Sequence, residues 1–476
     1  MRHHPQAFSW RLGVLAAAAA VFTLSGQTPQ QPPAGQPEPV AQQPTEIEVR
    51  ITGEPGVALR YAVPDFVALT PGAADEAKML AQVLWDDLNF EREFYMIQRD
   101  VSATVPAARG PQEFNFDAWR EIGADAVFFG TVSEKGEDVV VQVRLFNIRS
   151  RQSAFSQEYT VRARSARQIA HTISDAVLLQ QTGIRGVART RITFISDRNN
   201  ESLLGASQQR RSVKEVYVAD YDGANQTRIT TSRQLNVNPS WSADAQAIAY
   251  AGFRNDRGAD ILMSFIYTGI LRNLTEGRYP GGAATPAVSP DGRQIAFSAT
   301  PPGGGAYDLW VMNIDGTNAR RLTTHPDSEV SPTWSPSGTQ IAFVSDRLGV
   351  GREQIFIVNA DGSSLYRLNI PDNQVDRPTW APAPYNEIAY TARTGPGYDI
   401  KVHELTTGIT RQLTFGEGTN ESPAYSPTGR HVAFMSTRSG NIQVFTVGRD
   451  GNGLRQLTRA GNNQTPDWSN PPGAAK

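Results

Sequence analysis

The side chains best suited to catalysis are histidines and carboxylates, and few of them occur at catalytic spacings. His171 lies beside Thr172 and Asp175 in a segment of helical periodicity, and no second ligand or nucleophile occurs at a useful spacing from it. We therefore expect a packed or surface histidine. The sequence contains no Gly-x-Ser-x-Gly elbow, no His-Glu-x-x-His helix and no Gly-x-x-x-x-Gly-Lys phosphate loop. These observations predict a binding protein with no catalytic residue and no cofactor.

Recurring Asp-Gly pairs and tryptophans are the next candidates, for calcium binding and ligand binding respectively. The Asp-Gly pairs occur once per turn and lack the clustered carboxylates of a calcium loop. We read them as type I′ hairpin turns, which need positive φ at both central residues. The tryptophans recur once per repeat, which favours packing between repeats over ligand binding; they are Trp241, Trp334, Trp380 and Trp468. No metal site is predicted.

The elements that position these residues form a repeat that begins near residue 190. Its marker proline recurs at intervals of 47, 46, 46, 45 and 43 residues, at Pro239, Pro286, Pro332, Pro378, Pro423 and Pro466. A second marker, an apolar residue followed by Thr or Asn, also occurs six times, as in Leu322 with Thr323. Each unit contains four short segments typical of antiparallel strands, and four strands per unit at this period predict a propeller blade.

The two ends of the repeat region complement each other. Trp468 and Ser469 begin a sixth unit that lacks its second strand, and residues 192–198 supply a segment that matches residues 341–347. An open solenoid would leave flat edges exposed. We therefore predict an all-β six-bladed β-propeller over residues 186–470, closed by pairing of its N- and C-terminal strands.

Residues 46–185 predict a small mixed α/β N-terminal domain. Alternating or continuous apolar residues predict strands at 46–51, 60–69 (broken by Pro64), 94–98, 126–132, 139–148 and 154–161. Helical periodicity predicts helices at 73–90, 116–122 and 165–181, the last of which ends at Gly183. The chain is therefore expected to be multidomain.

The N-terminal sequence predicts export. Arg2 and Arg11 flank the start, and the apolar run at 12–24 is shorter than the roughly 20 residues of a membrane span, so we expect a signal peptide over residues 1–26 and a periplasmic protein. Residues 27–45 are rich in Pro and Gln and predict a disordered linker, and residues 471–476 predict a disordered tail. The chain has no cysteine, which excludes disulfides and a lipid-modified cysteine. Lys and Arg total 45 against 47 Asp and Glu, so the charge balance disfavours nucleic acid.

Several segments resemble a known family. The repeats resemble the PD40 type, and the junction from His171 through Gly183 and Gly186 to Ile192 resembles that of the TolB family. The segment from Val218 to Gln226 resembles the family's first complete blade, and Trp119 with residues 123–130 resembles its N-terminal domain. The resemblance covers about residues 46–470, and the long Pro/Gln segment before residue 46 departs from it.

The resemblance implies a component of the Tol-Pal system, which supports integrity of the Gram-negative outer membrane during cell division. TolB-like propellers bind the peptidoglycan-associated lipoprotein Pal, and the N-terminal region engages TolA. By this resemblance we expect a monomer that binds a Pal-like lipoprotein and a TolA-like protein, and that associates with the outer membrane through its partners.

The partner-binding residues are expected around the channel mouth. The loops that lead into the Trp-Ser strands and the turns after the Ile-Ala-Phe strands emerge at one end of the blades, and the linker at Thr190 arrives at the other. The predicted partner-binding residues are Asn238, Arg254, Tyr279, Asp327, Glu329, Ser331, Arg347, Asp376, Arg377, Asn420 and Glu421. The alternative function is a propeller hydrolase or lyase acting in the channel mouth through His325, His403 or channel carboxylates.

Overall fold

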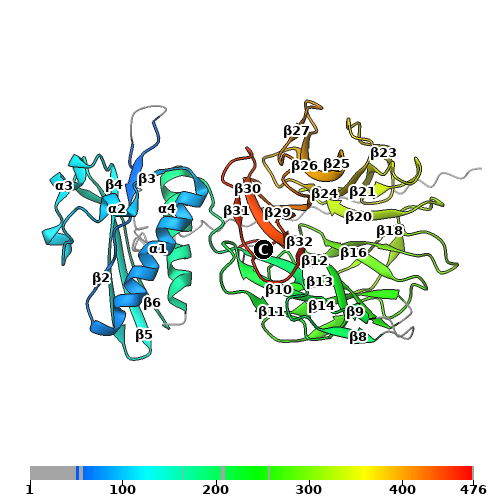
Figure 1. Cartoon of the computed structure of the whole chain (residues 1–476), viewed down its shortest axis with the longest axis horizontal. Coiled ribbons are helices and arrows are strands. Elements are labelled where there is room, and N and C mark those ends of the chain that lie inside the picture. The colour runs from blue at the N-terminus through cyan, green and yellow to red at the C-terminus, as the bar shows by residue number, and fades with distance from the viewer. Residues whose placement is uncertain (1–49, 53–56, 163–164, 205–209, 256–257, 474–476) are drawn as a thin grey trace, which may run out of the picture. The chain divides into compact units, whose positions relative to one another are not determined.

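A computed structural model describes residues 50–52, 57–162, 165–204, 210–255 and 258–473 (Figure 1). The predicted signal peptide and Pro/Gln linker lie outside these residues, as does the second half of the predicted tail. Among the described residues, no helix has the length and apolar character needed to cross a bilayer.

The N-terminal domain is a mixed sheet with strand order β3-β1-β4-β5-β6, in which β2 also pairs with β4. Its strands are β1 (Arg60–Ala62), β2 (Val67–Ala68), β3 (Tyr95–Met96), β4 (Ala126–Lys135), β5 (Asp138–Asn147) and β6 (Gln152–Arg162). Its helices are α1 (Ala74–Glu91), α2 (Arg99–Ser102), α3 (Phe116–Glu121) and α4 (Ala166–Thr182), with 3-10 turns at Pro71–Ala73 and Pro111–Glu113.

Alternation along β4 builds two apolar layers on this sheet. Phe128 packs with α1 and α4 on one face, whereas Val127 and Phe129 pack with Phe114 and Trp119 on the other. Successive strand residues point to opposite faces, so each neighbour along β4 joins a different core. The sheet is therefore covered on both sides.

Most predicted elements of this domain are confirmed, with three differences. Residues 46–49 of the predicted first strand lie outside the described residues, and Ile51 at its end is not in a strand. Ile51 is buried in the helix-side core, and its N–H donates to Gln181 Oε1 at 2.9 Å. The segment at 60–69 divides into β1 and β2 around Pro64, because proline has no N–H for the ladder. The short helix α2 was not predicted, because four residues are too few to show helical periodicity. As expected, α4 ends at Gly183, whose φ is +76°.

The described residues from Arg191 to Trp468 form the six-bladed β-propeller that the repeats predicted, and each blade is a four-stranded antiparallel sheet. The blades are numbered in chain order, and the strands of each are given from the axis outward. The first blade is β12 (Leu235–Trp241), β13 (Ala247–Asn255), β14 (Gly258–Phe265) and β15 (Leu271–Asn273), and the second is β16 (Ala283–Val288), β17 (Gln294–Ala299), β18 (Asp308–Asn313) and β19 (Arg320–Arg321). The third is β20 (Glu329–Trp334), β21 (Gln340–Ser345), β22 (Gln354–Asn359) and β23 (Tyr366–Arg367); the fourth is β24 (Val375–Trp380), β25 (Glu387–Thr394), β26 (Gly397–Glu404) and β27 (Thr410–Gln412); and the fifth is β28 (Asn420–Tyr425), β29 (His431–Ser439), β30 (Asn441–Gly448) and β31 (Arg455–Gln456).

The sixth blade combines both ends of the propeller sequence, as predicted. Its order is β32 (Asn463–Trp468), β7 (Arg191–Ser196), β10 (Glu215–Asp220) and β11 (Thr227–Arg228). Trp468 is the register partner of Ile192, and its indole Nε1 donates to Thr190 Oγ1 at 2.7 Å. The red strand β32 thus lies beside the green strand β12 of the first blade (Figure 1). The ring is closed by strand pairing.

The Leu-Thr marker has a structural cause. In five blades the threonine hydroxyl accepts a backbone N–H of the third strand, as when Ile400 N–H donates to Thr414 Oγ1 at 2.9 Å. In four of these blades the same hydroxyl donates to the side chain of the residue before that N–H, as from Thr414 Oγ1 to Asp399 at 2.8 Å. The third blade has Asn369 at this position, and there Gln354 instead bonds the carbonyls of Asp372 and Asn373. The marker therefore fixes the outer strand to the third strand.

The Asp-Gly turns differ from the prediction of type I′ geometry. Only the glycine of each pair has positive φ, for example +87° at Gly223 and +86° at Gly316. The aspartate keeps negative φ because its carboxylate accepts the N–H two residues later, at 3.0 Å from Ala224 to Asp222 and from Thr317 to Asp315. These are longer loops in which glycine alone supplies the left-handed residue.

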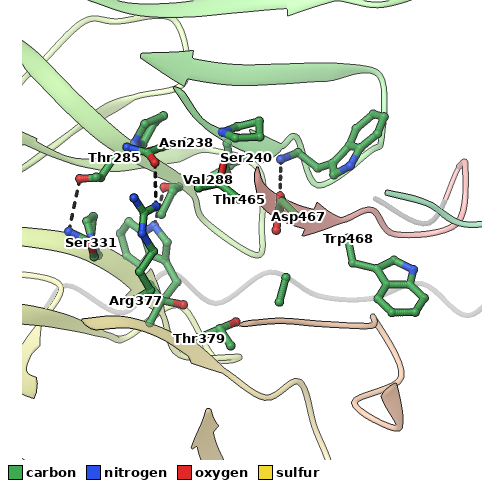
Figure 2. Close-up of a pocket in the computed structure, with 18 of the residues that line it drawn as sticks. Asn238, Ser240, Thr285, Val288, Ser331, Arg377, Thr379, Thr465, Asp467 and Trp468 are labelled. Atoms are coloured by element: carbon green, nitrogen blue, oxygen red, sulfur yellow. Dashed lines mark hydrogen bonds between the residues drawn. The ribbon is translucent and has the colours of Figure 1, made fainter. Parts of the chain in front are cut away.

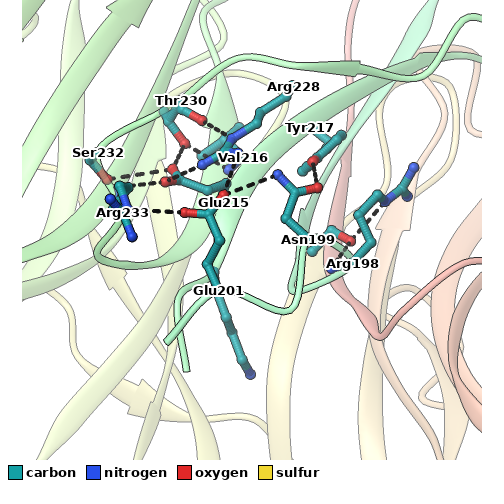
Figure 3. Close-up of polar contacts among 12 residues, drawn as sticks. Arg198, Asn199, Glu201, Glu215, Val216, Tyr217, Arg228, Thr230, Ser232 and Arg233 are labelled. Carbon is teal, nitrogen blue, oxygen red and sulfur yellow. Dashed lines mark hydrogen bonds and ion pairs between the residues drawn. The ribbon is translucent and has the colours of Figure 1, made fainter. Parts of the chain in front are cut away.

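The hairpin of β8 (Ser202–Leu204) and β9 (Arg210–Ser212), inserted between β7 and β10, was not predicted. Figure 3 shows the polar contacts at its base. Glu201 pairs with Arg228 at 2.8 Å, and Arg228 also pairs with the buried Glu215 at 3.0 Å. Asn199 accepts a hydrogen bond from the Tyr217 hydroxyl at 2.9 Å. The insertion is therefore attached to the sixth blade by charged and uncharged polar side chains, which carry no periodic signal in the sequence.

Two matched tryptophans test the closure. Trp468 and Trp334 are both 6% exposed, and both indoles donate a hydrogen bond, but only Trp468 lies on the strand that ends the propeller. We expect Trp334→Ala to lower the free energy of unfolding by about 3–5 kcal/mol, and Trp468→Ala to lower it more, because the terminal strand can then detach from β7. Urea unfolding of both variants measures this, and an equal or smaller loss for Trp468→Ala would contradict a seam at β7 and β32.

Candidate binding site at the channel mouth

Six bulges shape the central channel. Each innermost strand has a register shift at its marker proline. The residue before each proline has left-handed φ between +46° and +56°; these residues are Asn238, Thr285, Ser331, Arg377, Ser422 and Thr465. Left-handed φ is unfavourable for residues other than glycine, and it occurs where the surrounding structure enforces it. The bulges give each blade one non-glycine side chain at the channel.

These side chains line a cavity of about 270 Å³ on the propeller axis. Figure 2 shows Asn238, Thr285, Ser331 and Arg377 converging on it from separate strands. The sequence-based prediction included Asn238, Ser331 and Arg377 but missed Thr285, Ser422 and Thr465. Their position directly before the marker proline is the signal that would have found them.

Arg377 spans the channel. Its Nη1 donates to Asn238 Oδ1 at 2.7 Å (Figure 2). The inner strands β12, β16, β20 and β24 follow one another round the six-bladed ring, so β24 with Arg377 stands opposite β12 with Asn238. Two of the predicted partner-binding residues therefore bond to each other across the axis.

Carboxylates surround this arginine. The side chain of Asp376 is 50% exposed and accepts a hydrogen bond from Ser331 Oγ at 3.2 Å. Glu421 is half-buried; burial raises the pKa of its carboxyl, and the nearby Arg377 guanidinium opposes that rise. The mouth thus presents one guanidinium between two carboxylates, a mixed-charge surface suited to a polar protein partner.

Several other predicted residues are buried in contacts within the propeller. Glu329 is 0% exposed and forms a short ion pair with Arg347, whose guanidinium also lies 4.3 Å from the Phe356 ring centroid. Asn420 is 0% exposed and accepts from Arg438 Nη2 at 2.9 Å. Tyr279 is 7% exposed and packs in the apolar core between blades. These four predicted residues stabilise loops in this structure and offer little surface to a partner.

The other candidate binding residues and histidines do not line this cavity, or their side chains lie outside the described residues. Asp327 is exposed, with its carboxylate 3.4 Å from His325 Nδ1. The side chain of Arg254 lies outside the described residues. His403 is buried and its Nδ1 is 2.8 Å from Thr410 Oγ1. Neither His325 nor His403 lines the channel cavity. His171 is packed as expected, 3% exposed with Nδ1 2.8 Å from Asp87.

Asp467 is an acidic channel residue that the sequence analysis did not single out. It lines the cavity, and its carboxylate accepts the N–H of Trp241 at 2.7 Å (Figure 2). Burial raises the pKa of this carboxyl to about 6, against the opposing effect of the Trp241 and Trp468 N–H groups. In the described part of the chain, no three His, Asp, Glu or Cys side chains are grouped to hold a metal ion.

The fold and this site define a class: a six-bladed propeller, preceded by an α/β domain, with a polar mixed-charge mouth on its axis. Comparison with known proteins gives the family. The TolB beta propeller domain matches residues 179–471, and the TolB amino-terminal domain matches residues 47–154. The chain belongs to the TolB family.

Individual relatives support this family assignment. The Tol-Pal system protein TolB of Ruthia magnifica is 34% identical over 429 residues, which is 89% of this chain and 95% of that protein. The protein of the same name from Desulfosudis oleivorans is 32% identical over 55% of this chain and 57% of its own length. That from Haemophilus influenzae (strain PittEE) is 36% identical over 44% of this chain and 47% of its own length. This chain thus spans about half the length of these last two relatives. The crystal structure of TolB from Acinetobacter baumannii has the same fold, with a TM-score of 0.71 at 24% identity over 87% of this chain and 97% of that one.

The raised pKa of Asp467 predicts a pH-dependent stability. The folded pKa lies above the usual value, so this group's contribution to stability falls as pH rises through the range from 4 to 6 and stays low above it. Asp467→Asn keeps an acceptor for Trp241 and removes the charge, so we expect it to raise the free energy of unfolding by about 1–2 kcal/mol at pH 7.5 and to have little effect at pH 4.

The control for this prediction is Asp327→Asn, at an exposed carboxylate, which should change stability by less than about 0.5 kcal/mol at both pH values. Urea titrations at both pH values measure the free energy of unfolding of the unaltered chain and of the two variants. A destabilising effect of Asp467→Asn at pH 7.5 would show that the charged carboxylate is favoured at this position.

Proposed function

We propose that this chain is a non-catalytic periplasmic scaffold of the Tol-Pal system that binds a Pal-like lipoprotein at the channel mouth and a TolA-like protein through its N-terminal region. In this role it supports outer-membrane integrity during cell division. Membership of the TolB family, whose relatives carry the name Tol-Pal system protein, supports the assignment to that system. The signal-like sequence at residues 1–26 supports the compartment.

The observation that carries the Pal-binding proposal is the position and charge of the mouth. Asp376 and Arg377 have side chains 50% and 32% exposed, and they lie on a rigid ring of inner strands. The linker from the α/β domain enters the propeller at Arg191, the first residue of β7. Arg191 pairs with Asp220 at the end of the blade away from the mouth. The ion pairs from the α/β domain, Arg92 to Asp450 and Glu93 to Arg430, also involve turns at that other end. This arrangement favours the mouth as the surface for a large partner.

Side-chain exposure supports a division of the predicted partner-binding residues into two groups. Glu329, Asn420, Tyr279 and Arg347 are internally bonded or packed, so we assign them to loop support. The accessible residues Asp327, Ser331, Asp376, Arg377 and Glu421, with Asn238 as the acceptor for Arg377, are the proposed contacts. A partner that accepts hydrogen bonds from Arg377 would compete directly with Asn238, so binding and opening of the cross-channel bond are coupled in this proposal.

The test is binding of the soluble domain of the organism's own Pal-like lipoprotein, measured by calorimetry. We expect Arg377→Glu to weaken binding at least tenfold, because it places a third negative charge between Asp376 and Glu421. The matched control is Arg293→Glu, an exposed arginine in the β16–β17 turn at the opposite end of the blade, which should bind like the unaltered chain.

Equal affinity of the two variants would place the lipoprotein elsewhere. If instead the unaltered chain releases product from peptidoglycan fragments or peptides, and His325→Ala abolishes that turnover, the hydrolase or lyase alternative is favoured and the scaffold proposal fails.

A further inference from the structure

The loop at residues 370–374, which leads into the innermost strand β24 of the fourth blade, departs from the repeat. In five blades a threonine hydroxyl bonds the third strand, but the third blade has the exposed Asn369 at this position. There Gln354 Nε2, on β22, donates to the carbonyl oxygens of Asp372 at 2.9 Å and Asn373 at 3.0 Å. The loop is thus attached to the third blade by a contact in which the repeat marker takes no part.

The Asp372 side chain attaches the same loop to the fourth blade. Its Oδ2 accepts a hydrogen bond from the Tyr390 hydroxyl at 2.7 Å, and its Oδ1 accepts one from Lys401 Nζ at 2.5 Å. Tyr390 on β25 and Lys401 on β26 are register partners, so one carboxylate binds two neighbouring strands. The loop is therefore attached on both sides, to the third blade and to the fourth.

Burial strengthens this attachment. Tyr390 is 0% exposed, and the side chains of Asp372 and Lys401 are 9% and 18% exposed. Hydrogen bonds to a charged group are stronger than those between neutral groups, and salt screens partly buried charges less than exposed ones. Burial and the Asp372 carboxylate raise the pKa of the Tyr390 hydroxyl, so this hydroxyl stays protonated and remains a donor. These contacts favour a single conformation of the loop.

The loop leads to Arg377, the guanidinium at the channel mouth. Directly after the loop, Val375 N–H donates to the Glu353 carbonyl at 3.1 Å, and two residues later Arg377 has a left-handed φ of +50°. An arginine keeps this unfavourable conformation where its surroundings enforce it. If the loop were released, the backbone at Arg377 would relax toward negative φ, and the guanidinium would leave its position opposite Asn238.

We infer that Asp372 is a positioning residue for the proposed partner binding, and that it holds the loop before β24 so that Arg377 faces the partner. This role rests on the proposed function, in which Arg377 contacts the partner at the channel mouth. A preformed contact residue loses less conformational freedom on binding. Release of the loop therefore weakens binding without removing a contact.

Glu387 provides a matched control at the opposite end of the same blade. Its side chain is 1% exposed and accepts hydrogen bonds from the Tyr425 hydroxyl at 2.7 Å and from Arg449 Nη2 at 2.6 Å. It therefore has the same kinds of partner as Asp372, a tyrosine hydroxyl and a cation. Because Glu387 begins β25 at the end away from the mouth, its removal disturbs a comparable cluster and leaves the loop before β24 attached.

Amide hydrogen exchange tests the positioning in the full chain without a partner. In Asp372→Ala we expect the amides of Val375 and Arg377 to exchange at least about tenfold faster, because the loop before them is released. Glu387→Ala should leave both rates unchanged. Unchanged exchange at these two amides in folded Asp372→Ala would overturn the inference, as would an equal rise in Glu387→Ala.

A conservative variant separates the charge from the hydrogen bond. Asp372→Asn keeps an acceptor for Tyr390 and loses the negative charge, so it should raise both exchange rates by about threefold. This variant decides alone if circular dichroism shows that Asp372→Ala does not fold. Exchange at the rate of the unaltered chain would then contradict the positioning role.

Calorimetry with the soluble domain of the Pal-like lipoprotein tests the consequence for binding. Asp372→Ala should weaken binding about fivefold, and Glu387→Ala should bind like the unaltered chain. Because Asp372 acts through Arg377, adding Asp372→Ala to Arg377→Ala should cause no further loss. A second loss of similar size in the double variant would show a general loosening of the propeller and would contradict the positioning role. If the unaltered chain does not bind the lipoprotein, the proposed function fails, whereas the exchange rates still decide whether Asp372 holds Arg377 in place.

Discussion

Pairing of β7 with β32 is the constraint on which the propeller depends. These strands are separated by more than 260 residues of sequence, yet they form one antiparallel ladder from Asn463 opposite Ser196 to Trp468 opposite Ile192. Without this ladder the ring would have two open edges, and open edges of β-sheet invite pairing with other chains. Bonds on both sides of the ladder reinforce it: Trp468 Nε1 to Thr190, and Arg198 to Asn463 at 2.8 Å.

Closure also creates the site. The six inner strands bring their bulges to a common axis only when the ring is complete, and the cross-channel bond from Arg377 to Asn238 requires blades one and four to face each other at a fixed separation. In the proposed function, the partner therefore meets a preformed mouth whose geometry is set by all six blades.

The sequence predicted the architecture because the repeats carry redundant signals. Six marker prolines, six pairs of an apolar residue with Thr or Asn, and the complementary ends all indicated the same closed ring, and the structure gives each a physical cause. The prediction of type I′ geometry for the Asp-Gly turns was wrong, because aspartate in these loops bonds to the backbone and does not adopt positive φ. The β8–β9 hairpin was missed because it occurs once and has no periodic pattern.

The site was predictable in position but not in detail. Chain direction placed the polar loops at one end, whereas the burial of Glu329 against Arg347 and of Asn420 against Arg438 depends on side-chain pairing between neighbouring strands and loops. Thr285, Ser422 and Thr465 were missed because small hydroxyl residues give no chemical signal until their shared position before proline is recognised.

Amide hydrogen exchange at β7 tests the closure most directly. In the full chain, residues 192–196 should be protected as strongly as the interior strand β21, and a chain ending at residue 462 should lose that protection while the α/β domain keeps its own. Unchanged protection of residues 192–196 in the shortened chain would show that β32 is not what holds the ring together.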